Sequence, residues 1–131
     1  MRRKLLSAVF VITLLKAGVA GAITAEDFQV RTTQDLLDLC TVSASDPLAQ
    51  QAIHFCHGYL VGAFHFYLAW TEGPNATQTQ QLVCFPTGNV TRNEAVAMFV
   101  EWAKAHPQYL KEFPVETEFR FLVQKWPCTK K

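Results

Sequence analysis

The sequence predicts an all-α fold, a small disulfide-stapled bundle of about four helices. Three observations support this prediction. Apolar side chains recur at helical spacing in several separate segments. Signals for helix starts and stops divide these segments from one another. The chain of 131 residues also contains four cysteines, enough for two disulfides that would clamp a domain of this size.

Residues 1–22 read as a secretory signal peptide. The charged residues Arg2 to Lys4 precede an apolar run, residues 5–15, and Ala20-Gly21-Ala22 fits the small-x-small cleavage pattern. A retained membrane anchor is the rival interpretation, but the apolar run is too short to span a bilayer. We therefore expect residues 23–131 to form a single helical domain once the leader is removed.

Removal of the leader changes the charge of the chain. It takes away four of the 12 basic residues and leaves eight against 11 acidic ones, a net charge of −3. No basic stripe interleaved with aromatic residues remains, so we expect no binding to nucleic acid or to an anionic membrane. All four cysteines lie in residues 23–131, and an even number in an exported chain predicts disulfides and an oxidising compartment.

The first helix is expected to be short. Residues 23–31 show no periodicity and are interpreted as a poorly ordered lead-in. Thr32 or Thr33 can then cap a helix that has Asp35 in its opening turn and Cys40 near its end.

The longest predicted helix spans residues 51–70. Asp46-Pro47 signals its start, as an N-cap carboxylate followed by a proline at the first helical position. His54, Val61 and His65 share the side opposite its broad apolar face, which is made by Ile53, Cys56, Leu60, Ala63, Phe64 and Tyr67. The apolar run is shorter than the roughly 20 residues needed to cross a bilayer, so this helix is expected to form the core.

Gly58 and Gly62 lie four residues apart in this helix. Small side chains let another backbone come close, and a glycine inside a helix costs about 1 kcal/mol relative to alanine unless packing compensates. The favoured interpretation is that a neighbouring helix of the same chain packs there. The alternative is a homodimer seam.

Two further helices are predicted after a polar loop, residues 71–81, which contains Gly73-Pro74. Thr91 and Glu94 form a capping box at the start of the third helix, and His106-Pro107 ends it. Pro114 can open the fourth helix and Pro127 stops it. The expected apolar faces are Val96, Phe99, Trp102 and Ala103 in one and Val115, Phe119, Leu122, Val123 and Trp126 in the other.

Helix placement ranks the three possible disulfide connectivities. The third and fourth helices, joined by a short connection, are expected to lie antiparallel as an α-hairpin. Cys84 would then lie beside Cys128, and their bond would close a loop of about 45 residues, worth about 4 kcal/mol by chain entropy. Cys40 and Cys56 pair by elimination, at about 3 kcal/mol, although Cys56 lies well inside its helix.

No catalytic or metal constellation is apparent. His54-x-Cys56-His57 contains zinc-ligand residue types, but Cys56 lies about 160° from His54 on a helical wheel, too far for one ion. No Gly-x-Ser-x-Gly elbow or phosphate loop occurs. The chain is therefore not expected to be an enzyme or to hold a cofactor, and its aromatic residues are interpreted as core.

The chain contains several short motifs, most of them around the cysteines: Leu37-x-Leu39-Cys40, Cys56-x-Gly58-Tyr59-x-x-Gly62, Cys84-x-Pro86, His106-Pro107 and Trp126-Pro127-Cys128. In this order they resemble the Rap/Tai family of immunity proteins from bacterial type VI secretion systems. Members of that family are small exported helical proteins that neutralise peptidoglycan amidase effectors. The resemblance covers about residues 32–128.

The resemblance implies a compact helical fold with disulfides, a periplasmic location, frequent dimerisation, and inhibition by plugging an amidase's catalytic cleft. The matching residues hold a fold, so no inhibitory residue can be transferred from them. We hypothesise that the loop at residues 71–81 contacts the partner through Glu72, Asn75 and Gln78. The alternative function is a general periplasmic chaperone, acid-responsive through His54 and His65, or another helical binding protein. A small secreted enzyme is the third interpretation.

Overall fold

The computed structural model describes residues 22–74, 76, 81–86 and 88–128. The predicted leader, apart from Ala22, and the loop residues Asn75 and Gln78 lie outside the described residues. Within the described chain there are four α-helices and two short 3-10 helices, and no strand is formed. The prediction of a small all-α fold is confirmed.

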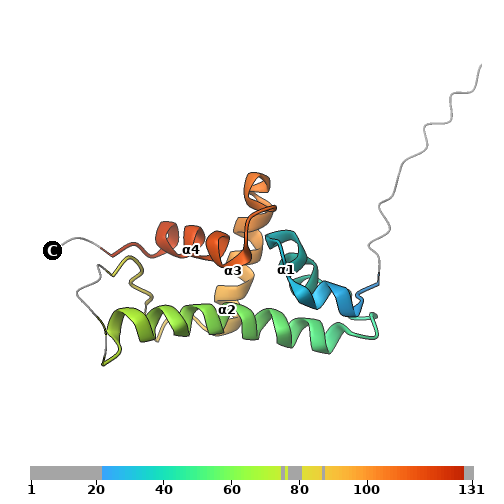
Figure 1. Ribbon diagram of the computed structural model, residues 1–131, viewed down its shortest axis with the longest axis horizontal. Coiled ribbons are helices and arrows are strands. Elements are labelled where there is room, and N and C mark those ends of the chain that lie inside the picture. The colour runs from blue at the N-terminus through green and yellow to red at the C-terminus, as the bar shows by residue number, and fades with distance from the viewer. Residues whose placement is uncertain (1–21, 75, 77–80, 87, 129–131) are drawn as a thin grey trace, which may run out of the picture.

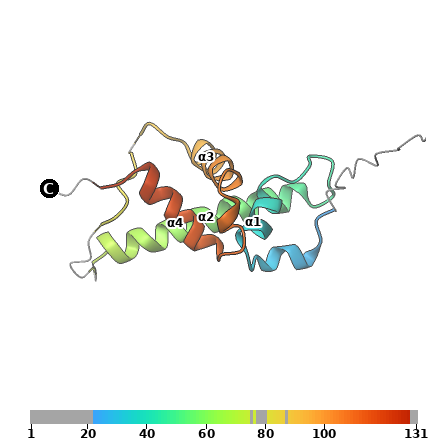
Figure 2. The same ribbon diagram turned by 90° about the horizontal axis from the view of Figure 1, so that it is seen from above.

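The longest helix, α2 (Ala49–Glu72), forms the base on which the other helices pack (Figure 1). Helix α1 (Thr33–Cys40) lies over its N-terminal half and α4 (Pro114–Lys125) over its C-terminal half. Helix α3 (Arg92–Lys104) stands steeply to both α2 and α4, as the two views agree (Figures 1 and 2). No helix of the described residues combines the length and the apolar character needed to span a membrane.

The expected antiparallel pairing of α3 and α4 is therefore wrong. The connection between them contains the 3-10 helix η2 (Pro107–Tyr109), and its carbonyl groups bind the start of α1. The Thr33 amide donates to the Glu112 carbonyl at 2.8 Å, and the Gln34 amide donates to the Leu110 carbonyl at 3.0 Å. The connection between α3 and α4 is thus bonded to α1 and does not form the tight turn of a helical hairpin.

The local signals for helix starts are confirmed for three helices. Thr32 caps α1 and Thr91 caps α3, each in a capping box with the acidic residue three positions later, and Pro114 is the first residue of α4. The expected cap of α2 is wrong. Asp46 accepts the amides of Leu48 at 2.8 Å and Ile23 at 2.9 Å, so the helix begins only at Ala49.

The lead-in is folded rather than poorly ordered. It forms the 3-10 helix η1 (Ala25–Gln29), whose N-cap Thr24 donates its amide and hydroxyl to Asp27; these hydrogen bonds lower the pKa of the Asp27 carboxyl. Phe28 then packs edge-on against Phe55 of α2, with ring centroids 5.5 Å apart. These contacts are not periodic in the sequence, which is why they were not predicted.

The core lies between α2 and the three helices above it. The buried row of α2 is Ala52, Cys56 and Leu60. On α4 the buried face is Pro114, Thr117, Glu118, Phe121 and Leu122, and the predicted face is rotated from it. Val115, expected to be in the core, is 39% exposed. The prediction followed only apolar side chains, whereas the true face includes two polar ones.

Two disulfides clamp the fold, and they have the connectivity favoured by the sequence analysis. Cys40–Cys56 joins the end of α1 to α2, with 5.2 Å between the Cα atoms, and Cys84–Cys128 has a Cα separation of 4.9 Å. The second pair is brought together by a β-bridge between Val83 and Pro127, not by a helical hairpin. The amide of Cys84 donates to the Trp126 carbonyl at 2.9 Å within this bridge.

Candidate functional site

One side of α2 faces away from the rest of the described chain. Phe66 and Trp70 are 72% and 62% exposed, and they continue an i, i+4 row that begins with Gly58 and Gly62. We call these four residues the outer row. Apart from the adjacent residues and the backbone of the same helical turns, no atom of the described chain lies within 4 Å of a Cβ atom built on either glycine. The expected packing of a helix of the same chain against Gly58 and Gly62 is therefore wrong.

The end of α2 leads from the outer row into the predicted partner-binding loop. Glu72 is the last residue of the helix and is exposed, and the Gln81 side-chain amide donates to its carboxylate. The Tyr67 hydroxyl accepts the amides of Leu82 and Val83 at 2.8 and 3.0 Å. Both ends of the loop are thus attached to the same two turns of α2.

A cavity of about 210 Å³ lies among α2, α3, α4 and the segment that precedes α3. Its walls are mostly apolar, and four phenylalanine side chains contribute to them. The buried or half-buried lining residues include Phe64, Phe85, Phe99, Phe121 and Glu118, and the exposed ones include His65 and Arg92. We call this cavity the phenylalanine pocket.

Glu118 is the unusual member of the phenylalanine pocket. Its side chain is 4% exposed, and its Oε2 atom has no hydrogen-bond partner among the described residues. Burial disfavours the charged form and raises the pKa of the carboxyl to about 9, so the group is neutral at pH 7. Glu118 was not among the predicted site residues, although it falls at i+4 from Pro114 and i−3 from Phe121, on the buried face of α4.

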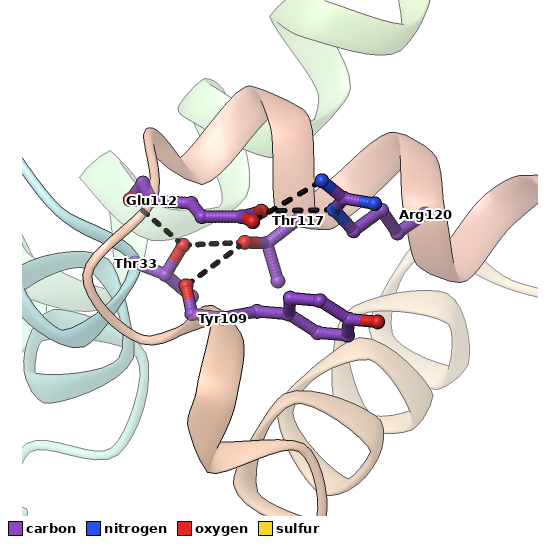
Figure 3. A network of polar contacts seen from close by, with 5 residues as sticks. All are labelled: Thr33, Tyr109, Glu112, Thr117 and Arg120. Carbon is purple, nitrogen blue, oxygen red and sulfur yellow. Dashed lines mark hydrogen bonds and ion pairs between the residues drawn. The ribbon is translucent and has the colours of Figure 1, made fainter.

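A cluster of polar side chains joins α1 to α4 and to the connection between α3 and α4 (Figure 3). The buried Thr33 hydroxyl donates to the Thr117 hydroxyl at 2.7 Å, and that of Thr117 donates to the Tyr109 carbonyl at 3.3 Å. Beside them Arg120 pairs with Glu112, with 2.8 Å between Nε and Oε2. These polar groups satisfy one another, so the arrangement is that of a structural cluster.

The histidines do not gather into a site. His54 and His65 are exposed on α2, and Cys56 is bonded to Cys40 and buried, so it is not available to a metal. In the part of the chain that the structure describes, no three His, Cys, Asp or Glu side chains lie close enough together to hold a metal ion.

A comparison with protein families places these features in context. A family model described as Rap1a immunity proteins matches residues 32–128. The match runs from the N-cap of α1 to the last cysteine and includes all four helices and both disulfides. No curated protein and no solved structure matches the chain.

Proposed function

Because this chain belongs to the Rap1a immunity protein family, we propose that it binds and occludes a peptidoglycan amidase effector of a type VI secretion system. The family match over residues 32–128 is the observation that carries this proposal, since an immunity protein acts on a partner effector protein. The amidase as target is what the resemblance to the Rap/Tai family implies. The protein would act by binding, without a catalytic step of its own.

We propose that residues 1–22 direct export and that the protein acts in the periplasm. The disulfides support this location, and the proposed target is consistent with it. Both disulfides fit an oxidising compartment. An inhibitor that is placed where peptidoglycan lies also meets an incoming amidase before the enzyme reaches its substrate.

The surface proposed to contact the effector is the C-terminal end of α2 with its loop. Trp70 and Phe66 expose large aromatic side chains there, and aromatic residues dominate the binding energy of protein interfaces. Glu72 adds a carboxylate at the base of the loop. Asn75 and Gln78 remain proposed contacts within the loop, because exposed loops on a stapled scaffold are common binding elements.

The glycine half of the outer row is proposed as a homodimer seam. Gly58 and Gly62 are exposed and have open space over their Cα atoms, so a helix of a second copy could approach closely. The aromatic half of the row would remain at the end of this contact, beside the effector-binding loop.

The proposal is tested with the purified protein and the amidase effector of the same secretion system. Calorimetry measures their affinity, and a peptidoglycan-hydrolysis assay measures the amidase activity with and without the protein. We expect stoichiometric binding and loss of hydrolysis. Trp70→Ala should weaken binding about thirtyfold, as for a hot-spot residue, and Glu72→Lys at least about tenfold.

Glu101→Lys is the matched control for the charge reversal, because Glu101 is exposed on α3, away from the loop. It should leave the affinity unchanged. Replacing residues 74–80 by a Gly-Ser linker of equal length should abolish binding. Unchanged affinity after this replacement would exclude the loop, and binding without inhibition would contradict occlusion of the catalytic cleft. Failure to bind any amidase would overturn the proposed target.

A further inference from the structure

We propose that the phenylalanine pocket is a socket for a tyrosine side chain of the partner protein, with the phenol hydroxyl hydrogen-bonded to Glu118. This inference rests on the proposed function, since it assumes that the protein binds another protein. It adds the chemistry of one contact that neither the family match nor the motifs specify.

The size of the pocket suits one aromatic ring. A dry apolar cavity of about 150 Å³ holds a benzene molecule, and this pocket is larger, at about 210 Å³. The difference leaves room for a hydroxyl substituent. Phe64 and Phe85 lie with ring centroids 5.3 Å apart, and Phe99 and Phe121 with 6.0 Å, so the walls already pack by the ring contacts that a further aromatic ring would make.

Glu118 supplies the polar contact that selects a phenol over a plain ring. Burial of a carboxyl group is unfavourable, and Glu118 is both buried and part of the pocket wall, so a ligand that hydrogen-bonds to this carboxyl from inside the pocket offsets part of that cost. The neutral carboxyl can donate through its hydroxyl or accept through its carbonyl oxygen, and a phenol can do the converse in either case. A phenol therefore pairs with Glu118 without any change of charge, and it is the neutral hydroxyl group that comes attached to an aromatic ring.

The rim of the pocket disfavours a cationic side chain as the occupant. Arg92 lines the pocket at the first position of α3, where the positive end of the helix dipole also lies, and exposed His65 lines it from α2. A lysine or arginine would have to enter past these groups and ionise Glu118 in an apolar site. A neutral tyrosine faces neither cost.

The test is an NMR titration of the purified protein with side-chain analogues: p-cresol for tyrosine, toluene for an apolar ring and n-butylamine for lysine. We expect saturable shifts at pocket residues such as Leu60, Val96 and Leu122 with p-cresol. Toluene should bind roughly tenfold more weakly, since it lacks one hydrogen bond. Glu118→Gln, which stays neutral and polar, should keep the preference for p-cresol, and Glu118→Leu should reduce p-cresol to the affinity of toluene.

A competition experiment assigns the pocket to the partner. Addition of the amidase effector should displace p-cresol from its complex with the protein. Tight binding of n-butylamine, absence of saturable shifts with p-cresol, or an equal preference for toluene in the unmodified protein would overturn the socket. Binding of p-cresol that the bound effector does not affect would overturn its assignment to the partner. The titration needs no effector, so its result stands apart from the proposed function.

Discussion

The carboxyl group of Glu118 occupies a position where the fold otherwise buries apolar atoms. Removing a charged carboxylate from water is so costly that the group remains protonated in the folded chain, with a pKa of about 9 against an ordinary value of 4.5. Unfolding exposes the group to water and restores its ordinary pKa. Between these two values the folded protein holds a proton that the unfolded chain releases.

Glu118 should therefore make the free energy of unfolding fall as the pH rises. The contribution of Glu118 is fully present below about pH 4.5 and is lost as the pH rises towards 9, with a slope approaching about 1.4 kcal/mol per pH unit within that window. Glu118→Gln removes the ionisation. Its stability relative to the unmodified protein should rise by roughly 2 to 4 kcal/mol between pH 5 and pH 8, measured by urea denaturation.

Glu116→Gln is the matched control for the substitution, because Glu116 is exposed on the same helix. The capping carboxylates act in the opposite direction. Hydrogen bonds to Thr24 and Thr91 lower the pKa values of Asp27 and Glu94, so their contributions are lost as the pH falls through the acidic range below about 4.5. If Glu118→Gln and the unmodified protein showed parallel stability curves from pH 5 to 8, the carboxyl would be ionised in the folded state.

Among the elements, α1 depends most on contacts distant in sequence. The first amides of a helix have no partner within it. In α1 those of Thr33 and Gln34 donate to carbonyl groups of the connection between α3 and α4, and that of Asp35 donates to the Thr32 hydroxyl. The buried hydroxyls of Thr33 and Thr117 bond to each other beside the same connection (Figure 3). The start of α1 is therefore held by the start of α4.

Removing either hydroxyl should destabilise the protein, because it breaks the buried 2.7 Å hydrogen bond between them. The hydroxyl that remains keeps a carbonyl partner, Glu112 at 3.2 Å for Thr33 and Tyr109 at 3.3 Å for Thr117. We therefore expect Thr117→Val and Thr33→Val each to lower the free energy of unfolding by about 0.5 to 1.5 kcal/mol. The double variant should lose less than the sum of the two, since both partners of the 2.7 Å hydrogen bond are then gone.

Denaturation curves of the four proteins give this coupling. Thr71→Val is the control: among the described residues the Thr71 hydroxyl donates to the Tyr67 carbonyl of its own helix, and its loss should cost less than about 0.5 kcal/mol. Additive losses at positions 33 and 117 would show that the two hydroxyls do not act as a pair.

The same elements show what the sequence could and could not predict. The capping boxes at Thr32 and Thr91 and the proline at position 114 act over three or four residues, so their helices were located correctly. The steep setting of α3 was not predictable, because it depends on a connection whose carbonyl groups are bound by α1, far away in sequence.

The candidate site divides in the same way. Glu72 and the loop beside it follow from local polarity. The phenylalanine pocket could not be found in advance, since three helices and the segment before α3 each contribute part of its wall. Thr117 and Glu118 were excluded from the expected core of α4 as polar residues. Thr117 is buried because Thr33 satisfies it, and that partner is visible only in the folded chain.

For the whole molecule, the decisive feature is that α2 has two different long sides. One side carries the core, and the other presents the outer row, in which the two glycines have open space above them and the two aromatic side chains are largely exposed. Large aromatic side chains on an uncovered helix face are typical of interaction surfaces. Glycines in the middle of the same helix reduce its stability, and packing against a partner is what would compensate for them.

Substituting these glycines should separate the stability of one copy from the association of two. A methyl group at position 58 or 62 meets no atom within 4 Å, so Gly58→Ala and Gly62→Ala should each raise the free energy of unfolding of the monomer by up to about 1 kcal/mol. In a homodimer seam the same methyl groups would separate the two helices. Sedimentation over a range of concentrations should then show weaker association of the double variant, while dilute samples unfold at higher denaturant.

Asn93→Ala tests whether helix propensity alone explains such results. Asn93 is exposed in α3, so its replacement should stabilise the monomer by a few tenths of a kcal/mol without changing association. Opposite signs of the two effects, confined to positions 58 and 62, are what a close seam requires. Two results would show that these glycines have no role in dimerisation. One is that the protein sediments as a monomer at every concentration, and the other is that the double variant associates as strongly as the unmodified protein.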